Sequence, residues 1–300
     1  MSSVLKALAY FDVFNFPLSR REIEQFADPS TRLNLDDELH WLVEAKLIFF
    51  LDGYYALRDD MTLVRKRVAG DHRAKSYIEQ AFKKSRLIAK FPYVRGVFIS
   101  GSLSKGTMTE DGDIDYFIVT APNRLWIART LLIAYKKVFL LNSRKYFCIN
   151  YLIDDETLEI QHKNRFTATE LVTLWPIVNR VLYQDLVKEN SWVDSFYPEY
   201  FEGNDRGSMD VKSGFLKKTL ESILDLKWGD VLDDFFMKLT LSRWRKKFPH
   251  MEKDDFDVAL KTTKRVSKHH PSHFQKKVLE GYTHRISDLE LKMNEIQSVA

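Results

Sequence analysis

Residues that cross-link a chain or interrupt its regular structure are scarce in this sequence. Its 300 residues include one cysteine, Cys148, which excludes an intramolecular disulfide and a zinc site built from cysteines alone. Eleven glycines and eight prolines are too few for a collagen-like or low-complexity chain. Hydrophobic residues make up 45% of the chain, which suffices for a sizeable core. Length and composition therefore predict an ordered, mixed α/β protein of two or three domains in a reducing compartment.

Long apolar runs and a strong excess of one charge are also missing. The longest apolar stretch, residues 126–141, is interrupted by Arg129, Lys136 and Lys137. It predicts a core helix, because a membrane-spanning helix needs about 20 predominantly apolar residues. The amino terminus shows no charged segment followed by an apolar one, the pattern of a signal peptide. The net charge of +4 is too small to require a nucleic-acid or membrane partner. We therefore expect a cytoplasmic protein that does not associate with membranes.

The first of three blocks, residues 1–60, is predicted to contain three helices and a β-hairpin that turns at Asp52-Gly53. This order resembles a winged helix. The helix expected to enter DNA, residues 34–41, carries three carboxylates at its start, which would repel phosphates. We therefore expect an interaction or structural domain that contacts a protein partner. A winged-helix nucleic-acid binder is the less favoured alternative.

The second block, residues 61–162, alternates helical and strand patterns. A long basic helix ends at Pro92, and strands are predicted at 94–100, 113–120 and 146–153, with a helix before the last. This order predicts a small mixed sheet with helices packed on it. The basic helix face offers charges for a nucleic-acid backbone, but such faces are more often simply solvated.

The third block, residues 163–300, is predicted to be almost entirely helical. Its first helix has the capping-box pattern Thr167 to Glu170, an apolar face from Leu171 to Leu186, and a kink at Pro176. The fold class predicted for the whole chain is α+β. It combines a winged-helix-like domain at 1–60, a small mixed sheet at 61–162 and a helical region at 163–300.

The segment that points to chemistry runs from Gly101 through Ser102 and Lys105 to Gly106 and directly follows a predicted strand. Two glycines bracket a tight strand-to-helix turn, whose backbone N–H groups are suited to phosphate oxygens. Ser102 adds a hydroxyl donor and Lys105 a positive charge. The simpler alternatives are an ordinary turn and a solvated lysine. The pattern does not match a Walker P-loop.

Asp113 and Asp115 follow, with ten residues between Ser102 and the first of them. Two residues apart on a strand, both carboxylates face the same side. They repel each other unless a cation lies between them. An exposed strand end is the simpler explanation of the pair alone, but its distance from Ser102 favours a metal site.

These two segments resemble the signature of the DNA polymerase beta nucleotidyltransferase superfamily, especially its minimal and kanamycin-type members. Their pattern is Gly-Ser-x-Ala-Arg-Gly, a short spacer, and Asp-hydrophobic-Asp. Here Ser104 stands in place of Ala and Lys105 in place of Arg. The resemblance covers about residues 94–155, roughly a fifth of the chain.

The resemblance implies roles for five residues. Gly101 and Ser102, with Lys105 beside them, would contact the triphosphate of a nucleotide, and Asp113 and Asp115 would hold Mg²⁺ as the catalytic carboxylates. It also implies the reaction, which is transfer of NMP from an NTP, with ATP as the expected donor, to a hydroxyl acceptor that the sequence does not identify.

One feature departs from the family pattern, which includes a third carboxylate on the next strand. The matching strand, residues 147–153, contains no acid, and Asn150 is the expected occupant of that place. An amide does not accept a proton at neutral pH. Only a bulge or a different register would bring in Asp154, Asp155 or Glu159. The alternative function is therefore a non-catalytic nucleotide-binding or regulatory protein.

Overall fold

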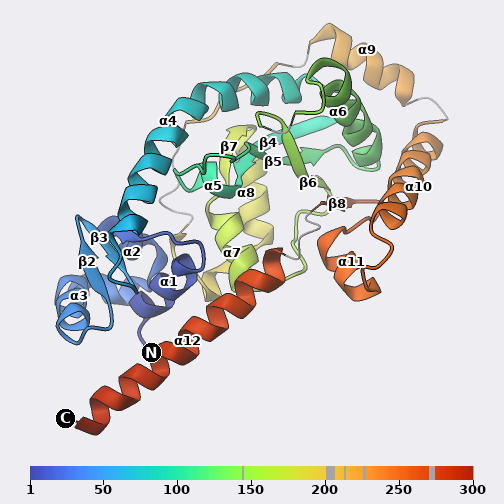
Figure 1. The fold of residues 1–300 in the computed structure, drawn as a ribbon. Coiled ribbons are helices and arrows are strands. Elements are labelled where there is room, and N and C mark those ends of the chain that lie inside the picture. Colours follow the sequence, from blue (N-terminus) through green and yellow to red (C-terminus); the bar gives the residue numbers. More distant parts are fainter. Residues whose placement is uncertain (144, 201–206, 213, 226–227, 270–273, 300) are drawn as a thin grey trace.

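The structure is a computed structural model that describes residues 1–143, 145–200, 207–212, 214–225, 228–269 and 274–299. A central sheet is surrounded by helices, and a smaller sheet lies in an amino-terminal module (Figure 1). The long helix α4 (Met61–Ala89) runs from this module to the central sheet. None of the described helices has the length and apolar composition that a bilayer crossing requires.

The amino-terminal module contains the three helices and the hairpin that the sequence predicts. Its elements are α1 (Ser3–Asp12), β1 (Leu18–Ser19), α2 (Arg20–Phe26), the 3-10 helix η1 (Pro29–Asn34), α3 (Leu35–Glu44), β2 (Phe49–Leu51) and β3 (Tyr54–Ala56). The strands form an antiparallel sheet in the order β1-β3-β2. Ser19 and Glu22 form a reciprocal capping box that begins α2. The side chains of Phe11, Leu39 and Leu47 are buried, as expected from their spacing.

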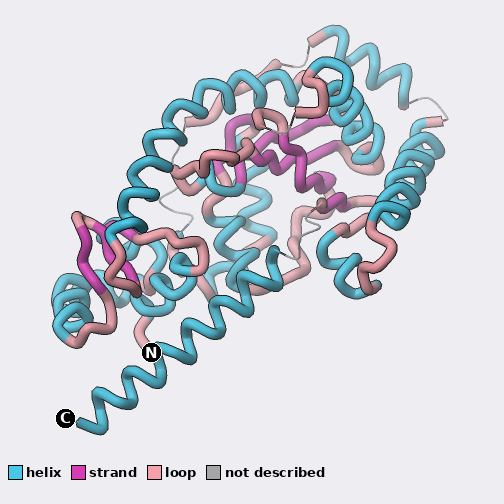
Figure 2. Tube along the Cα trace, in the orientation of Figure 1, coloured by secondary structure: helices cyan, strands magenta, loops and turns pink. Residues whose placement is uncertain are grey.

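The central sheet is mixed, as predicted. Its strands are β4 (Val94–Ser100), β5 (Asp115–Thr120), β6 (Cys148–Asp154), β7 (Trp175–Val178) and β8 (Val266–Lys268). They lie in the order β7-β4-β5-β6-β8, and β5 runs parallel to β6 while the other neighbouring pairs are antiparallel. Figure 2 shows the strands enclosed by helices.

Both faces of the central sheet are covered, so every residue of β5 beyond Asp115 is buried and all of these except Thr120 are hydrophobic. Tyr116 and Ile118 pack with Trp126 of α6 (Leu125–Phe139). Phe117 and Val119 face the opposite side and belong to a core that also includes residues of the amino-terminal module. The polar start of β5 therefore lies at the edge of a buried layer.

The prediction of a single helix with a kink at Pro176 is wrong. The chain instead forms α7 (Arg165–Val172), β7 and α8 (Arg180–Glu189), and Asn164 rather than Thr167 caps α7. Pro176 lies opposite Phe98 in β7, at the edge of the sheet order, where a missing backbone N–H is tolerated. Because β7 and β8 both come from the block expected to be helical, the sheet extends beyond residue 162.

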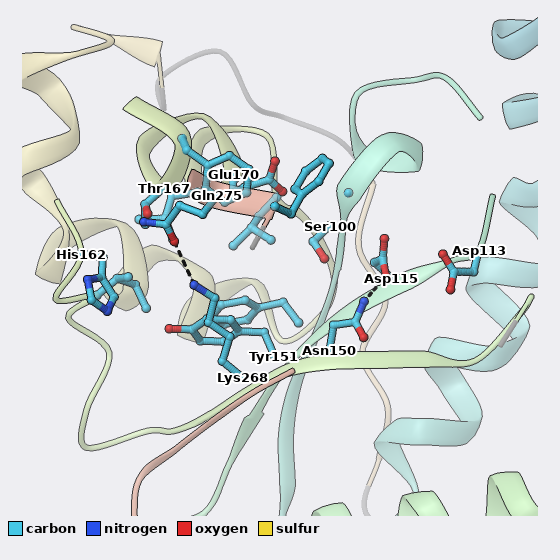
Figure 3. A pocket seen from close by; sticks show the side chains of 17 residues that line it. Ser100, Asp113, Asp115, Asn150, Tyr151, His162, Thr167, Glu170, Lys268 and Gln275 are labelled. Carbon is cyan, nitrogen blue, oxygen red and sulfur yellow. Dashed lines mark hydrogen bonds between the residues drawn. The ribbon is translucent and has the colours of Figure 1, made fainter. Parts of the chain in front are cut away.

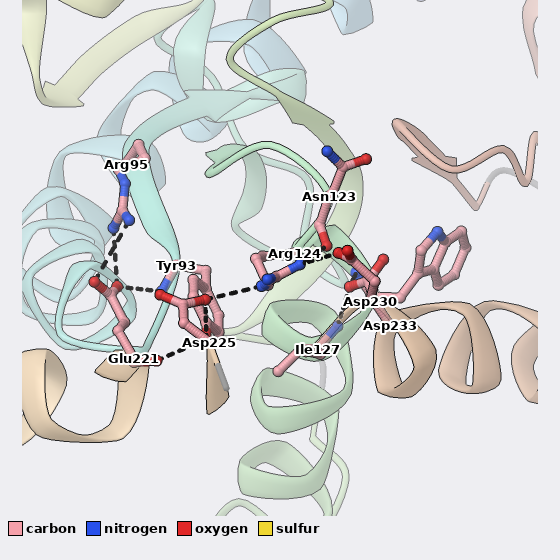
Figure 4. Close-up of polar contacts among 10 residues, drawn as sticks. Tyr93, Arg95, Asn123, Arg124, Ile127, Glu221, Asp225, Asp230 and Asp233 are labelled. Carbon is pink, nitrogen blue, oxygen red and sulfur yellow. Dashed lines mark hydrogen bonds and ion pairs between the residues drawn. The ribbon is translucent and has the colours of Figure 1, made fainter. Parts of the chain in front are cut away.

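The remaining elements are η2 (Ser191–Ser195), α9 (Phe215–Leu224), α10 (Gly229–Lys247), α11 (Lys253–Ala259) and α12 (Phe274–Val299). Polar contacts fix α9 and α10 to the sheet domain (Figure 4). Asp233 of α10 accepts hydrogen bonds at 2.9 Å from the backbone N–H groups of Trp126 and Ile127, and so caps α6. Glu221 of α9 pairs with Arg95 at 2.9 Å.

The first and last described helices, α1 and α12, are also in contact. Asp12 of α1 accepts hydrogen bonds from Arg58 at 2.9 Å and from Arg285 of α12 at 2.6 Å. The amino-terminal module therefore rests against the carboxy-terminal helix and shares its core with α7 and α8.

Candidate functional site

The turn after β4 contains the first part of the site. Gly101 opens the short helix α5 (Gly101–Ser104) with φ of +67°, a value that favours glycine. A Cβ atom at this position would lie 2.4 Å from Oδ2 of Asp115. The hydroxyl of Ser104 closes the turn by donating to the carbonyl of Gly101 at 2.9 Å. Glycine is thus required both by the backbone conformation and by the carboxylate packed against it.

Asp113 and Asp115 form the second part. The expectation that both lie on one strand is wrong, because β5 begins at Asp115 and Asp113 precedes it. The two side chains still converge, since one carboxylate oxygen from each and Sγ of Cys148 all lie within 4.8 Å of one another. Ser100 lies opposite Asp115 in the β4–β5 register, which places the pair directly beside the turn.

The electrostatics of the pair are unfavourable without a cation. Burial, followed by repulsion from Asp113, raises the pKa of Asp115 to about 7. Burial and the same carboxylates also raise the pKa of Cys148, so its sulfur is a neutral thiol. Carboxylate oxygens are the ligands that Mg²⁺ prefers, whereas a thiol is a poor ligand for it. The two aspartates therefore fit a hard divalent cation, and Cys148 does not add to that fit.

Asn150 lies next to Asp115, although a bulge interrupts the β5–β6 register between Tyr116 and Phe117. Its amide nitrogen donates a hydrogen bond to Oδ1 of Asp115. The bulge brings no further acid to this point, because Asp154 lies opposite Thr120 at the far end of the strand. An amide therefore contacts the pair on the strand where the family pattern has a carboxylate.

Ser102 and Lys105 are held by contacts within the protein. The hydroxyl of Ser102 donates to the sulfur of Met108 at 3.6 Å. The ammonium group of Lys105 donates to the carbonyl of Gly101 at 3.1 Å and to Oε1 of Glu170 at 2.9 Å. The lysine thus bridges the turn and α7 and carries a carboxylate partner.

A cavity of about 310 Å³ opens beside the carboxylate pair (Figure 3). At one end it is lined by Ser100, Gly101, Asp113, Asp115 and Asn150. The remaining lining residues come from β5, β6, α7, β8 and α12, the loop before α7 and the link between α7 and β7: Phe117, Tyr151, Ile160, His162, Phe166, Thr167, Glu170, Leu171, Leu174, Lys268, Phe274 and Gln275. The site is therefore a pocket between the sheet and the helices that cover this face.

Sequence patterns do not predict two of the charged residues that line this cavity, Glu170 and Lys268. Glu170 has the sequence pattern of a helix-capping residue, and Lys268 belongs to a segment expected to be helical. One indirect indication points to Glu170. Residues 147–153 lack the third carboxylate of the family pattern, so a carboxylate from another element is needed to take its role. Lys268 had no signal, because its strand joins the sheet from far along the chain.

Comparison with known proteins relates part of the chain to a domain family. Residues 82–177 match the family model of the nucleotidyltransferase domain, while no curated protein and no solved structure matches the chain. The matched region runs from α4 to β7 and includes the turn at Gly101, the carboxylate pair and Glu170. It is roughly a third of the chain. The turn at Gly101 and the carboxylate pair thus lie in the part of the chain that has the sequence features of a nucleotidyltransferase domain, whereas β8 and α12 complete the cavity from outside it.

Proposed function

We propose that the protein is a Mg²⁺-dependent nucleotidyltransferase that moves NMP from an NTP, with ATP as the expected donor, to a hydroxyl acceptor. The observation that carries the proposal is the packing of Asp115 against Gly101, with the Asp113 carboxylate beside it, inside the region that matches the domain family. Since NTPs are abundant in the cytoplasm, we propose that compartment as its location.

The proposed role of each site residue follows from its position in the site. Oxygens of Asp113 and Asp115 hold the cation, which when bound neutralises charge on the triphosphate. The backbone N–H groups of the turn at Gly101 and the hydroxyl of Ser102 bind phosphate oxygens. Lys105 exchanges its Glu170 partner for a phosphate oxygen.

In the transfer step, the acceptor oxygen forms a bond to the α-phosphorus, and the bond from that phosphorus to the bridging oxygen breaks. The electron pair leaves with pyrophosphate, and catalysis rests mainly on positioning and charge neutralisation. Glu170 accepts the hydroxyl proton. It lines the same cavity as the aspartates, interacts electrostatically with Asp115, and is freed when Lys105 turns to phosphate.

A non-catalytic nucleotide-binding protein is the second candidate, and Asn150 is the observation that favours it. Its amide donates to Asp115 at the place where the family pattern has a proton-accepting carboxylate. In that case Glu170 remains paired with Lys105 and the site binds nucleotide without transfer.

We propose that the winged-helix-like module contacts a protein rather than nucleic acid. The first turn of α3 carries Asp36, Asp37 and Glu38, and Asp36 is held by Arg20 at 2.6 Å. Carboxylates on the helix that would face DNA repel the phosphate backbone.

Incubation with α-labelled ATP, GTP, CTP or UTP and Mg²⁺, with cell-extract metabolites as acceptors, tests transfer directly. The proposed reaction yields pyrophosphate and a labelled product with the wild type and neither with Asp113→Asn. Nucleotide binding without release of pyrophosphate in every mixture supports the non-catalytic candidate instead.

A further inference from the structure

Lys268 is an unusual side chain for a protein interior. It is only 7% exposed, lines the cavity, and donates to the amide oxygen of Gln275 at 2.9 Å. Within the described part of the chain, no carboxylate lies at ion-pair distance from it. Burial, with Lys261 nearby, lowers its pKa to about 8, although the Glu170 carboxylate across the cavity acts in the opposite direction. Because a buried cation without an anion in direct contact is costly, Lys268 is suited to an anionic group supplied from outside.

The walls between Lys268 and the aspartates are mostly apolar. Phe117 and Tyr151 stack with their ring centroids 5.0 Å apart and almost parallel, and they form the sheet side of the cavity. Phe166 and Leu171 line the helical side. A cavity of about 310 Å³ is at the small end of the range for small-molecule pockets. It is too small to admit a folded protein or a nucleic-acid duplex.

The cavity reaches the turn at Gly101 but not the two side chains proposed to contact phosphate. Its lining includes Asp113 and Asp115 but neither Ser102 nor Lys105. Figure 3 shows the aspartates at one side of the view and the Lys268–Gln275 pair across the cavity. The cavity thus meets the carboxylates and Gly101 at one end, while Ser102 and Lys105 lie outside it and remain available to a nucleotide.

We infer that this cavity binds the acceptor, and that the acceptor is a small molecule with a hydroxyl group at one end and a carboxylate or phosphate at the other. Lys268 and Gln275 bind the anionic group, the apolar walls hold the body of the molecule, and its hydroxyl lies beside Asp113 and Asp115. The identification as acceptor rests on the proposed nucleotidyl transfer, whereas the anion site rests on the cavity alone.

The binding test uses matched probes without nucleotide. Calorimetry compares 3-(4-hydroxyphenyl)propionate and 6-hydroxyhexanoate with their neutral amides, and 4-hydroxybenzylphosphonate represents the phosphate class. We expect at least one anion to bind about tenfold more tightly than its neutral counterpart, and the preferred anion distinguishes carboxylate from phosphate. Lys268→Met should remove this preference. Lys261→Met, a neighbouring lysine outside the cavity that also donates to a glutamine, should keep it.

Stability provides a second measurement that separates binding from a structural role. Lys268→Met should raise the ligand-free melting temperature by a few degrees, because it removes a buried, unneutralised charge. A marked drop would show that Lys268 serves to hold α12 through Gln275 and would overturn the inference. Equal binding of anions and amides, no binding by any probe, or an anion preference that survives Lys268→Met would overturn it as well.

The two proposals fail in different ways. Anion binding that depends on Lys268, with no pyrophosphate released from any NTP, leaves the anion site standing and refutes nucleotidyl transfer. If pyrophosphate is released at a rate that neither the anionic probes nor Lys268→Met changes, the result supports nucleotidyl transfer and refutes this acceptor site.

Discussion

Gly101 and Asp115 are packed so closely that a single added Cβ atom on the glycine would lie 2.4 Å from the carboxylate oxygen Oδ2. This contact joins the turn proposed to bind phosphate to the strand proposed to bind metal. The position of the Asp115 carboxylate therefore depends on the backbone of the turn being free of a side chain at residue 101.

Gly101→Ala should therefore damage the site more than it damages the fold. The left-handed backbone costs a residue with a Cβ about 1–2 kcal/mol, and displacement of Asp115 adds to that cost. Gly106→Ala is the matched control, because Gly106 also has a positive φ of +78° but open space around it. Nucleotide-dependent stabilisation should vanish in the first variant and persist in the second, as measured by thermal unfolding with Mg²⁺ and NTP. If both substitutions changed the nucleotide-dependent stabilisation equally, that result would contradict this account.

The pKa of Asp115 predicts how stability depends on pH. In the folded protein this pKa is raised from its ordinary value of 3.8 to about 7, so between these values the unfolded chain has lost the proton that the folded protein retains. The free energy of unfolding should fall as pH rises from about 4 to 7, and Asp115→Asn should lack this part of the fall. Urea unfolding of both proteins without metal at pH 5, 6, 7 and 8 measures the difference, and saturating Mg²⁺ should reduce it. A difference that does not change with pH would show that the carboxylate is not destabilised.

Two substitutions separate the roles proposed for the acids and the amide. Glu170→Gln should lower transfer by about a hundredfold or more, since it removes the proton acceptor, while leaving Mg²⁺–NTP binding in place. Asn150→Asp should raise transfer, because it puts a carboxylate beside Asp115. Rates of pyrophosphate release at fixed NTP and acceptor concentration give both results. Glu170→Gln with unchanged rates would rule out Glu170 as the base.

Asp233 allows a test of the fold that is independent of function. It caps α6 through two backbone N–H groups, so Asp233→Ala should lower the free energy of unfolding by about 1–2 kcal/mol. Asp233→Asn keeps an oxygen that accepts the hydrogen bonds and removes the carboxylate, whose pKa burial raises to about 6. This substitution should therefore lower the free energy of unfolding by less than Asp233→Ala does. Urea unfolding at pH 7 compares the three proteins. A larger loss with asparagine than with alanine would contradict the capping role.

The sequence predicted the elements whose signals are local. The hairpin at Asp52-Gly53, the capping box at Ser19 and strands β4 to β6 all follow from turn residues and periodicity within a few positions. Trp175–Val178 was misassigned, because its apolar residues also continue the helical spacing that begins at Leu171. Only pairing with β4, which lies about 80 residues earlier, makes it a strand.

The same distinction applies to the site. Gly101 and Asp115 were predicted to be neighbours because their spacing matches a known pattern, and they are in contact. Asn150 was placed beside the pair by strand order, and its amide reaches Asp115. Glu170 and Lys268 were not predictable, because their place depends on how α7 and β8 pack against the sheet. Long-range packing, rather than any local pattern, completes the cavity.

The most direct measurement is the melting temperature with NTP, with and without Mg²⁺, for the wild type, Asp113→Asn and Asp115→Asn. Asp111→Asn, at an exposed position in the preceding loop, serves as the matched control. If the carboxylate pair holds the metal, the Mg²⁺-dependent part of the NTP-induced shift is present in the wild type and in the control. It is lost in the two site variants, which remain folded. An identical shift in all four proteins would contradict the account, since the pair would then play no part in binding metal and nucleotide.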